Sequence, residues 1–157
     1  MSNKNFELAL EKAKNCKFYR TTGGESDTFI KKSESKLKIK FSKQNHDFYS
    51  KLGYLSLYGH EIYGIDPDDT SGILEGNSVA YALNDRDKYG LPNEWLPIYF
   101  FDDGYMAYLD YSQLNCSGEP PVIKAIYNGK EYIITEKVAE DFGDFLLGLV
   151  EEQLANQ

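Results

Sequence analysis

Two pairs of short apolar segments, each joined by a tight-turn sequence, limit most strongly how this chain can fold. Residues 96–101 and 105–110 flank Asp-Asp-Gly, and residues 122–127 and 131–134 flank Asn-Gly. Turn sequences of this kind between apolar runs are typical of β-hairpins. Strands joined by hairpins are antiparallel, and such a sheet buries at least one face against other elements. The second half of the chain therefore predicts a mostly antiparallel sheet.

The first third of the chain predicts helices. Apolar side chains recur at spacings that favour a helix in residues 3–15, 26–37 and 42–53. Ser26 and Ser42 stand where their hydroxyl groups can cap the second and third of these helices. Residues 36–41 alternate strictly between basic and apolar side chains, which taken alone is a strand pattern.

The middle of the chain predicts a further hairpin and an inserted helix. Residues 54–58 and 61–65 alternate on either side of Gly59-His60, as the two arms of a hairpin do. Residues 77–90 then predict a helix, and the Gly90 and Pro92 that follow favour its end.

A C-terminal helix is predicted to begin at Thr135, with apolar side chains from Val138 to Val150 along one face. Gly143 and Gly148 would each lower the stability of this helix by about 1 kcal/mol relative to alanine, which suggests close packing or a break. The whole order predicts an α+β fold: N-terminal helices, a mostly antiparallel sheet with an inserted helix, and a C-terminal helix packed on one sheet face.

Length and cysteine content indicate one domain in a reducing compartment. The 157 residues suit a single domain spanning 1–157. The longest apolar run, residues 95–101, is far shorter than the roughly 20 residues of a membrane span. Cys16 and Cys116 have no metal-site or redox spacing, so we expect reduced thiols in a cytoplasmic protein and no membrane partner.

The net charge of −8 conceals a strong asymmetry along the chain. Residues 1–60 hold 12 basic and 6 acidic side chains, a net charge of +6, whereas residues 61–120 hold 2 basic and 12 acidic ones, a net charge of −10. A nucleic-acid-binding protein usually shows the opposite balance, because it must neutralise phosphates. The acidic middle segment instead favours a basic protein partner, although an acidic surface also serves solubility.

The residues that could carry chemistry form no recognisable catalytic or metal-binding motif. Asp66, Asp68 and Asp69 resemble half of a calcium loop, but the sixth position lacks glycine and the twelfth lacks glutamate. Asp102 and Asp103 could supply one carboxylate for glycoside hydrolysis, yet a hairpin turn explains them fully. The sequence therefore predicts no catalytic residue, no metal and no cofactor.

Aromatic residues are concentrated where the first hairpin of the sheet is predicted. Seven of them occur within 17 residues: Trp95, Tyr99, Phe100, Phe101, Tyr105, Tyr108 and Tyr111. Alternate residues of a strand face opposite sides, so some of these rings would lie on an open sheet face unless all of them fill the core. Tyrosine and tryptophan are enriched at the centres of protein interfaces.

Short motifs in a fixed order resemble the SUKH superfamily, which is typified by a yeast regulator of cell-wall synthesis. They occupy residues 29–37, 41, 47–53 and 61–65, then Tyr-Gly-Leu-Pro at 89–92, Trp-Leu-Pro-Ile at 95–98, and residues 102–104, 108–110 and 121–123. The resemblance covers about residues 26–150. It implies an α+β fold and, for bacterial members, the role of an immunity protein.

Immunity proteins bind and block a toxin, so the resemblance implies a protein partner and no enzymatic activity. Many such toxins are nucleases, which are usually basic, and the acidic middle segment would suit one. We expect the contact surface to include Asp66, Asp68, Asp69, Asp102 and Asp103, with Tyr99 and Tyr105 as anchors. Two alternatives stay open: a non-enzymatic regulatory or scaffold domain that binds several proteins, and a small hydrolase that uses the carboxylates.

Overall fold

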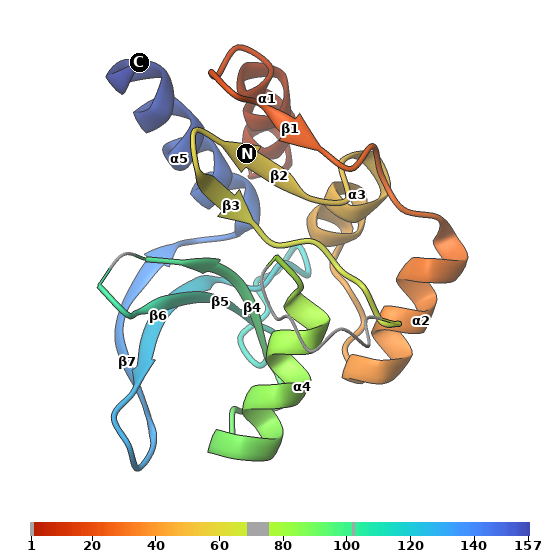
Figure 1. The fold of residues 1–157 in the computed structure, drawn as a ribbon, viewed down its shortest axis with the longest axis vertical. Coiled ribbons are helices and arrows are strands. Elements are labelled where there is room, and N and C mark those ends of the chain that lie inside the picture. Colours follow the sequence, from red (N-terminus) through yellow and green to blue (C-terminus); the bar gives the residue numbers. More distant parts are fainter. Residues whose placement is uncertain (1, 69–75, 102) are drawn as a thin grey trace.

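The computed structural model describes residues 2–68, 76–101 and 103–157 (Figure 1). The helices are α1 (Ser2–Ala13), α2 (Asp27–Leu37), α3 (Lys43–Lys51), α4 (Ser78–Tyr89) and α5 (Phe142–Asn156). The strands are β1 (Arg20–Thr21), β2 (Leu55–Leu57), β3 (His60–Ile62), β4 (Trp95–Phe100), β5 (Met106–Asp110), β6 (Val122–Tyr127) and β7 (Tyr132–Ala139). No helix in the described part of the chain has the length and apolar character needed to cross a membrane.

The strands form two antiparallel sheets, in the orders β1-β2-β3 and β4-β5-β6-β7. Strand β4 has a bulge at Ile98, between Pro97 and Tyr99. The Ile98 carbonyl accepts a hydrogen bond from the backbone N–H of Tyr63, just after β3, at 2.9 Å, and this bond connects the two sheets. The α+β fold is confirmed. The predicted strands are divided between two sheets, and the short strand β1, which joins the first of them, was not predicted.

Helices α4 and α5 pack on opposite faces of the larger sheet. Tyr89 at the end of α4 contacts Tyr127 of β6, with ring centroids 4.9 Å apart. Phe145 of α5 contacts Tyr99 of β4 at 5.7 Å, so the predicted packing of the C-terminal helix on one sheet face is confirmed. Helix α1 lies along α5 (Figure 1) and runs parallel to it, because Asn5 bonds to Asp144 near their first turns and Lys12 bonds to Glu151 further along.

The N-termini of α3 and α5 meet in one buried group of polar side chains. The Gln44 side chain donates to the Asp141 carboxylate at 3.3 Å and accepts from the Gly143 N–H at 2.8 Å. Asp141 also accepts from the Asp144 N–H at 2.9 Å, which caps α5. Glu119 accepts from the Gln44 N–H at 3.3 Å, and burial raises the pKa of the Glu119 carboxyl. Unpaired helix N-terminal N–H groups are thus satisfied inside the protein.

The two N-terminal helix caps predicted from the sequence, Ser26 and Ser42, are confirmed. Ser26 accepts from Phe29 N–H, and Ser42 accepts from Asn45 N–H. Asn77 caps α4 by accepting from Val79 and Ala80 N–H, and Gly90 ends α4 in the left-handed conformation. These features are local, so a short stretch of sequence suffices to predict them.

Two predicted element boundaries are wrong. The alternating residues 36–41 do not form a strand, because α2 continues through Leu37 and Lys38 then turns left-handed with φ of 58°. The last helix does not begin at Thr135: β7 runs from Tyr132 to Ala139, and Asp141 caps a helix that starts at Phe142. Residues 132–139 include β-branched and aromatic side chains that suit a strand, and hydrogen bonding to β6 extends the hairpin through them.

Strand β7 forms one edge of the larger sheet. Its pairing with β6 shifts register twice, which leaves Thr135 and Val138 without a direct partner on β6. Each extra residue is a bulge, and bulges bend an edge strand and strengthen its twist. Ile133 and Ile134 on this strand are exposed.

Replacing Asp141 with alanine should lower the free energy of unfolding by about 2–4 kcal/mol. The change removes the cap of α5 and leaves the buried Gln44 amide without its acceptor. Urea denaturation followed by circular dichroism measures the loss. The exposed neighbour Glu140 provides the matched control: Glu140→Ala should change stability by no more than about 0.5 kcal/mol. Equal effects of the two substitutions would contradict the structural role of Asp141.

Candidate functional site

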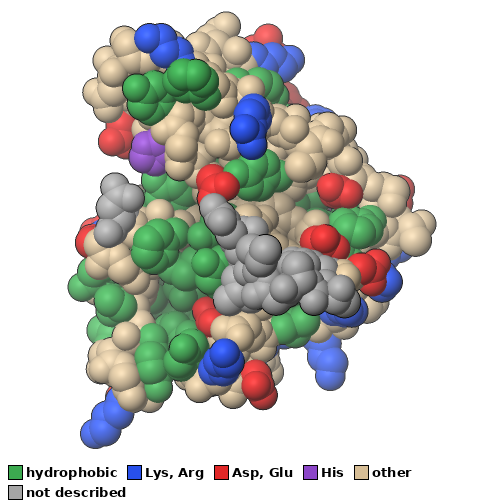
Figure 2. Space-filling model, viewed as in Figure 1, with side chains coloured by type: hydrophobic (Ala, Val, Ile, Leu, Met, Phe, Trp, Pro, Cys, Tyr) green, Lys and Arg blue, Asp and Glu red, His purple; other side chains and the backbone are tan. Residues whose placement is uncertain are grey.

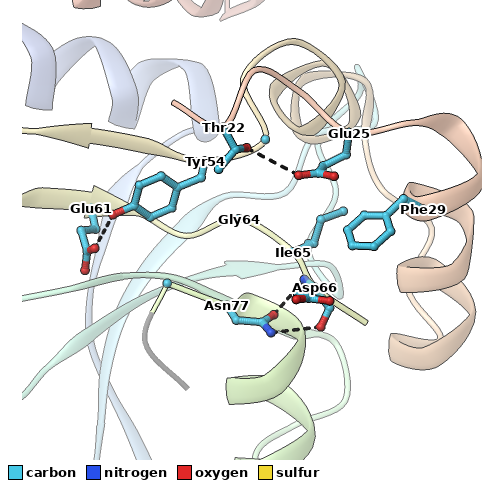
Figure 3. A pocket seen from close by; sticks show the side chains of 11 residues that line it. Thr22, Glu25, Phe29, Tyr54, Glu61, Gly64, Ile65, Asp66 and Asn77 are labelled. Carbon is cyan, nitrogen blue, oxygen red and sulfur yellow. Dashed lines mark hydrogen bonds between the residues drawn. The ribbon is translucent and has the colours of Figure 1, made fainter. Parts of the chain in front are cut away.

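An open cleft of about 470 Å³ lies between β3, the segment after β3, helix α2 and the N-terminus of α4 (Figure 3). Three carboxylates from separate segments line it: Glu25 from the loop before α2, Glu61 from β3, and Asp66 from the segment after β3. No lysine or arginine is among the described residues that line the cleft. We call it the acidic cleft.

The charged groups of the acidic cleft influence one another. Burial raises the pKa of the Glu25 carboxyl above its ordinary value of 4.5; the hydrogen bond from Thr22 lowers it, and the charge of Asp66 raises it. The Tyr54 hydroxyl donates to the Glu61 carboxylate (Figure 3). Burial, this hydrogen bond and the Glu61 charge raise the pKa of Tyr54 to about 12. Glu25 and Asp66 therefore influence one another, whereas Glu61 is bonded to Tyr54. The charge of Arg20 also reaches Tyr54 and acts to lower its pKa, although no lysine or arginine is among the described lining residues of the cleft.

The backbone around Asp66 is fixed by the residue that caps α4. The Asn77 side chain accepts from the Asp66 N–H at 3.1 Å and donates to the Asp66 carbonyl at 3.0 Å (Figure 3). The same side-chain oxygen caps α4. One amide therefore sets the position of Asp66 relative to the helix.

Glycine allows the floor of the cleft to be tightly packed. A Cβ atom added to Gly64 would lie 2.4 Å from the Gly53 carbonyl oxygen, a distance that no side chain tolerates. Gly64 also pairs through its backbone with Gly76 and Ser78. The segment after β3 can therefore pass directly beneath the end of α3 only with glycine at position 64.

A second hollow of about 540 Å³ adjoins the acidic cleft and shares Glu61 with it. We call it the aromatic groove; its other lining residues are Tyr58, Gly59, His60, Tyr63, Tyr81, Tyr99 and Phe100. Tyr63 and Tyr81 stack with ring centroids 5.3 Å apart and planes 3° apart. Tyr58 and Phe100 are 57% and 49% exposed, which is high for such large apolar side chains. Figure 2 shows acidic and hydrophobic side chains gathered on this face.

Two of the predicted site residues belong to this combined surface. Asp66 lies in the acidic cleft, and Tyr99 lines the aromatic groove. Tyr99 is only 8% exposed, because its ring stacks on His60 and its hydroxyl lies 2.7 Å from His60 Nδ1. Asp68 lies just beyond Asp66 and pairs with Lys32 of α2.

Asp103 and Tyr105 are not brought to the cleft. Asp103 lies 3.4 Å from the Lys124 ammonium of β6, and that ammonium sits 4.9 Å from the centre of the Tyr105 ring. Asp103 and Tyr105 therefore form a separate cluster in which a cation of the chain itself offsets the acidic charge. Asp69 and Asp102 lie outside the described residues.

Sequence reasoning missed Glu25, Tyr54 and Glu61, which provide half of the polar side chains that line the acidic cleft. Each stands alone in the sequence, and two of them come from the first 60 residues, where basic side chains predominate. The sequence pattern instead points to the three carboxylates within residues 66–69. No local signal marks residues that only the tertiary fold brings together.

The site shows no arrangement typical of a metal centre. Within residues 2–68, 76–101 and 103–157, no group of three or more His, Cys, Asp or Glu side chains is placed to hold a metal ion. Both cysteines are free thiols; Cys16 is buried and Cys116 is exposed. The cleft and the groove instead form an open surface lined by carboxylates and aromatic rings.

Comparison with known proteins places the chain in a family. No curated protein matches the chain. The family model described as SMI1-KNR4 cell-wall (SUKH_5) matches residues 7–151, which includes most of α1 as well as the segment on which the sequence motifs lie. Because the match extends over far more than half of the chain, this protein belongs to the SMI1-KNR4 family of the SUKH superfamily.

Proposed function

We propose that this chain is an immunity protein that binds a cognate toxin, basic and of nuclease type, and neutralises it by covering its active site. The observation that carries the proposal is the acidic cleft beside the aromatic groove. The cleft holds three carboxylates with no cation in its described lining, and the groove exposes large rings. Membership of the SUKH superfamily is consistent with such a role.

The proposed partner follows from electrostatic complementarity. A nuclease needs lysine and arginine to hold phosphates, and those same side chains would enter the acidic cleft. Opposite charges speed association, and the exposed aromatic side chains supply contact area at small entropic cost. The inhibitor itself requires no catalytic residue and no cofactor. Its place of action would be the cytoplasm, where both free thiols would stay reduced.

Co-expression tests the function directly. The domain encoded at the C-terminal end of the neighbouring gene product is expressed in a host cell with and without this chain. We expect the domain alone to arrest growth and this chain to restore it. Growth arrest that this chain does not relieve, or a harmless neighbour, would contradict the immunity role and favour a scaffold role.

Removal of the cleft charges should weaken binding to that toxin domain. The variant Glu25→Gln/Glu61→Gln/Asp66→Asn keeps the side-chain shapes but abolishes three charges, so we expect the Kd to rise by about 100-fold or more. Titration calorimetry on the purified proteins measures it. Glu7→Gln/Glu131→Gln/Glu136→Gln removes three exposed charges outside the cleft and should change the Kd by no more than about threefold. A similar loss in both variants would show that only net charge matters.

The cleft should also lower stability in the absence of the toxin. Glu25 has a raised pKa, so its ionisation costs free energy in the folded state at every pH above that pKa. Glu25→Gln should therefore have a higher Tm than the unsubstituted protein at pH 7. The difference should shrink as the pH falls through the Glu25 pKa and vanish below 4.5. A lower Tm for Glu25→Gln at pH 7 would contradict this account.

A further inference from the structure

A groove of about 520 Å³ lies along the junction of α5 with the larger sheet, on the sheet face opposite to α4. Phe101, Val138, Phe145 and Leu149 give it apolar walls, contributed by the sheet and by α5. It shares His60 and Tyr99 with the aromatic groove, so the two hollows adjoin. We call it the α5 groove.

Gly148 lies on the wall of this groove, in the middle of α5. The sequence suggested that a glycine here marks close packing or a break in the helix. The structure shows neither: α5 is continuous from Phe142 to Asn156, and a Cβ atom added to Gly148 would meet nothing within 4 Å. Neither the packing nor the backbone conformation of this chain requires glycine, although alanine would favour the helix. The missing side chain leaves room for something outside the chain.

The groove is acidic as well as apolar. Asp144 and Glu152 line it, and no lysine or arginine is among its described lining residues. Lys124 lies over the Phe101 ring at 4.7 Å, but its charge is paired with Asp103. Glu152 stands near the C-terminus of α5, where a negative charge is unfavourable, and the last turn of that helix has no basic residue. A cation from a partner would relieve that arrangement.

We propose that the α5 groove receives a second segment of the same basic protein partner, one in which an apolar side chain is flanked by lysine or arginine. The apolar side chain enters between the sheet and α5, the partner's backbone passes over Gly148, and its cations approach Asp144 and Glu152. This inference rests on the proposed function and extends the contact surface from the acidic cleft, through the aromatic groove, to the C-terminal helix.

The test fills the groove without disturbing the fold. Gly148→Trp places a large ring in the space that the partner would occupy, whereas Gly148→Ala adds one methyl group and should raise the Tm. Ser35→Trp puts the same ring on the exposed surface of α2, on the far side of the molecule from α5 in Figure 1. Binding to the toxin domain identified by co-expression is measured by calorimetry for all three variants.

We expect Gly148→Trp to raise the Kd by about tenfold or more, while Gly148→Ala and Ser35→Trp stay within about threefold of the unsubstituted protein. Glu152→Lys should also weaken binding, and the loss should shrink at high salt. If the unsubstituted protein binds and both Gly148→Trp and Glu152→Lys bind equally well, the groove proposal is overturned while the immunity role stands. If the unsubstituted protein does not bind the domain, both proposals fall. Circular dichroism confirms that each variant is folded before binding is measured.

Discussion

The buried contact between the N-termini of α3 and α5 is the interaction on which the rest of the structure depends. Gln44 and Asp141 come from segments almost 100 residues apart. The Gln44 side chain accepts from the Gly143 N–H, which α5 leaves unpaired, and Asp141 in turn accepts from the Gln44 side chain. The other end of α3 holds one side of the acidic cleft. Carbonyl groups near the C-terminus of α3 accept hydrogen bonds from the N–H groups of Thr22 and Glu25, at 3.1 and 2.9 Å. The loop that carries Glu25 is thus held by a helix whose other end is fixed in the core.

In the acidic cleft, the carboxylates that would favour the proposed binding lower the stability of the fold. Two of the cleft's three carboxylates are close enough that the charge of Asp66 raises the pKa of Glu25, and no lysine or arginine is among its described lining residues. The chain does neutralise other carboxylates, since Lys32 pairs with Asp68 and Lys124 pairs with Asp103. This contrast is the reason for our proposal that the charge of the cleft serves an external group rather than the fold itself.

The sequence predicts features that depend on interactions between residues close along the chain, and it misses those that depend on tertiary contacts. Caps such as Ser26 and Ser42 act over three residues, so the local sequence predicts them, and the α+β class follows from the hairpin and helix patterns. The start of α5 was misplaced because β7 is extended by pairing with β6, a tertiary effect that outweighs local preference. Asp66 and Tyr99 were found within acidic and aromatic runs, whereas Glu25 and Glu61 come together only through folding. The pairing of Asp103 with Lys124 depends on the register of β5 with β6, which no local pattern reveals.

The irregular edge of the larger sheet affects how readily the protein would aggregate at high concentration. A straight outer strand offers its free backbone groups as a template for further strands, and chains joined in that way grow into fibres. The bulges at Thr135 and Val138 interrupt the even spacing that such growth needs, although Ile133 and Ile134 would otherwise favour it. In the proposed immunity role an edge of this kind would be useful, because an inhibitor kept in excess over its toxin could stay dispersed and ready to bind.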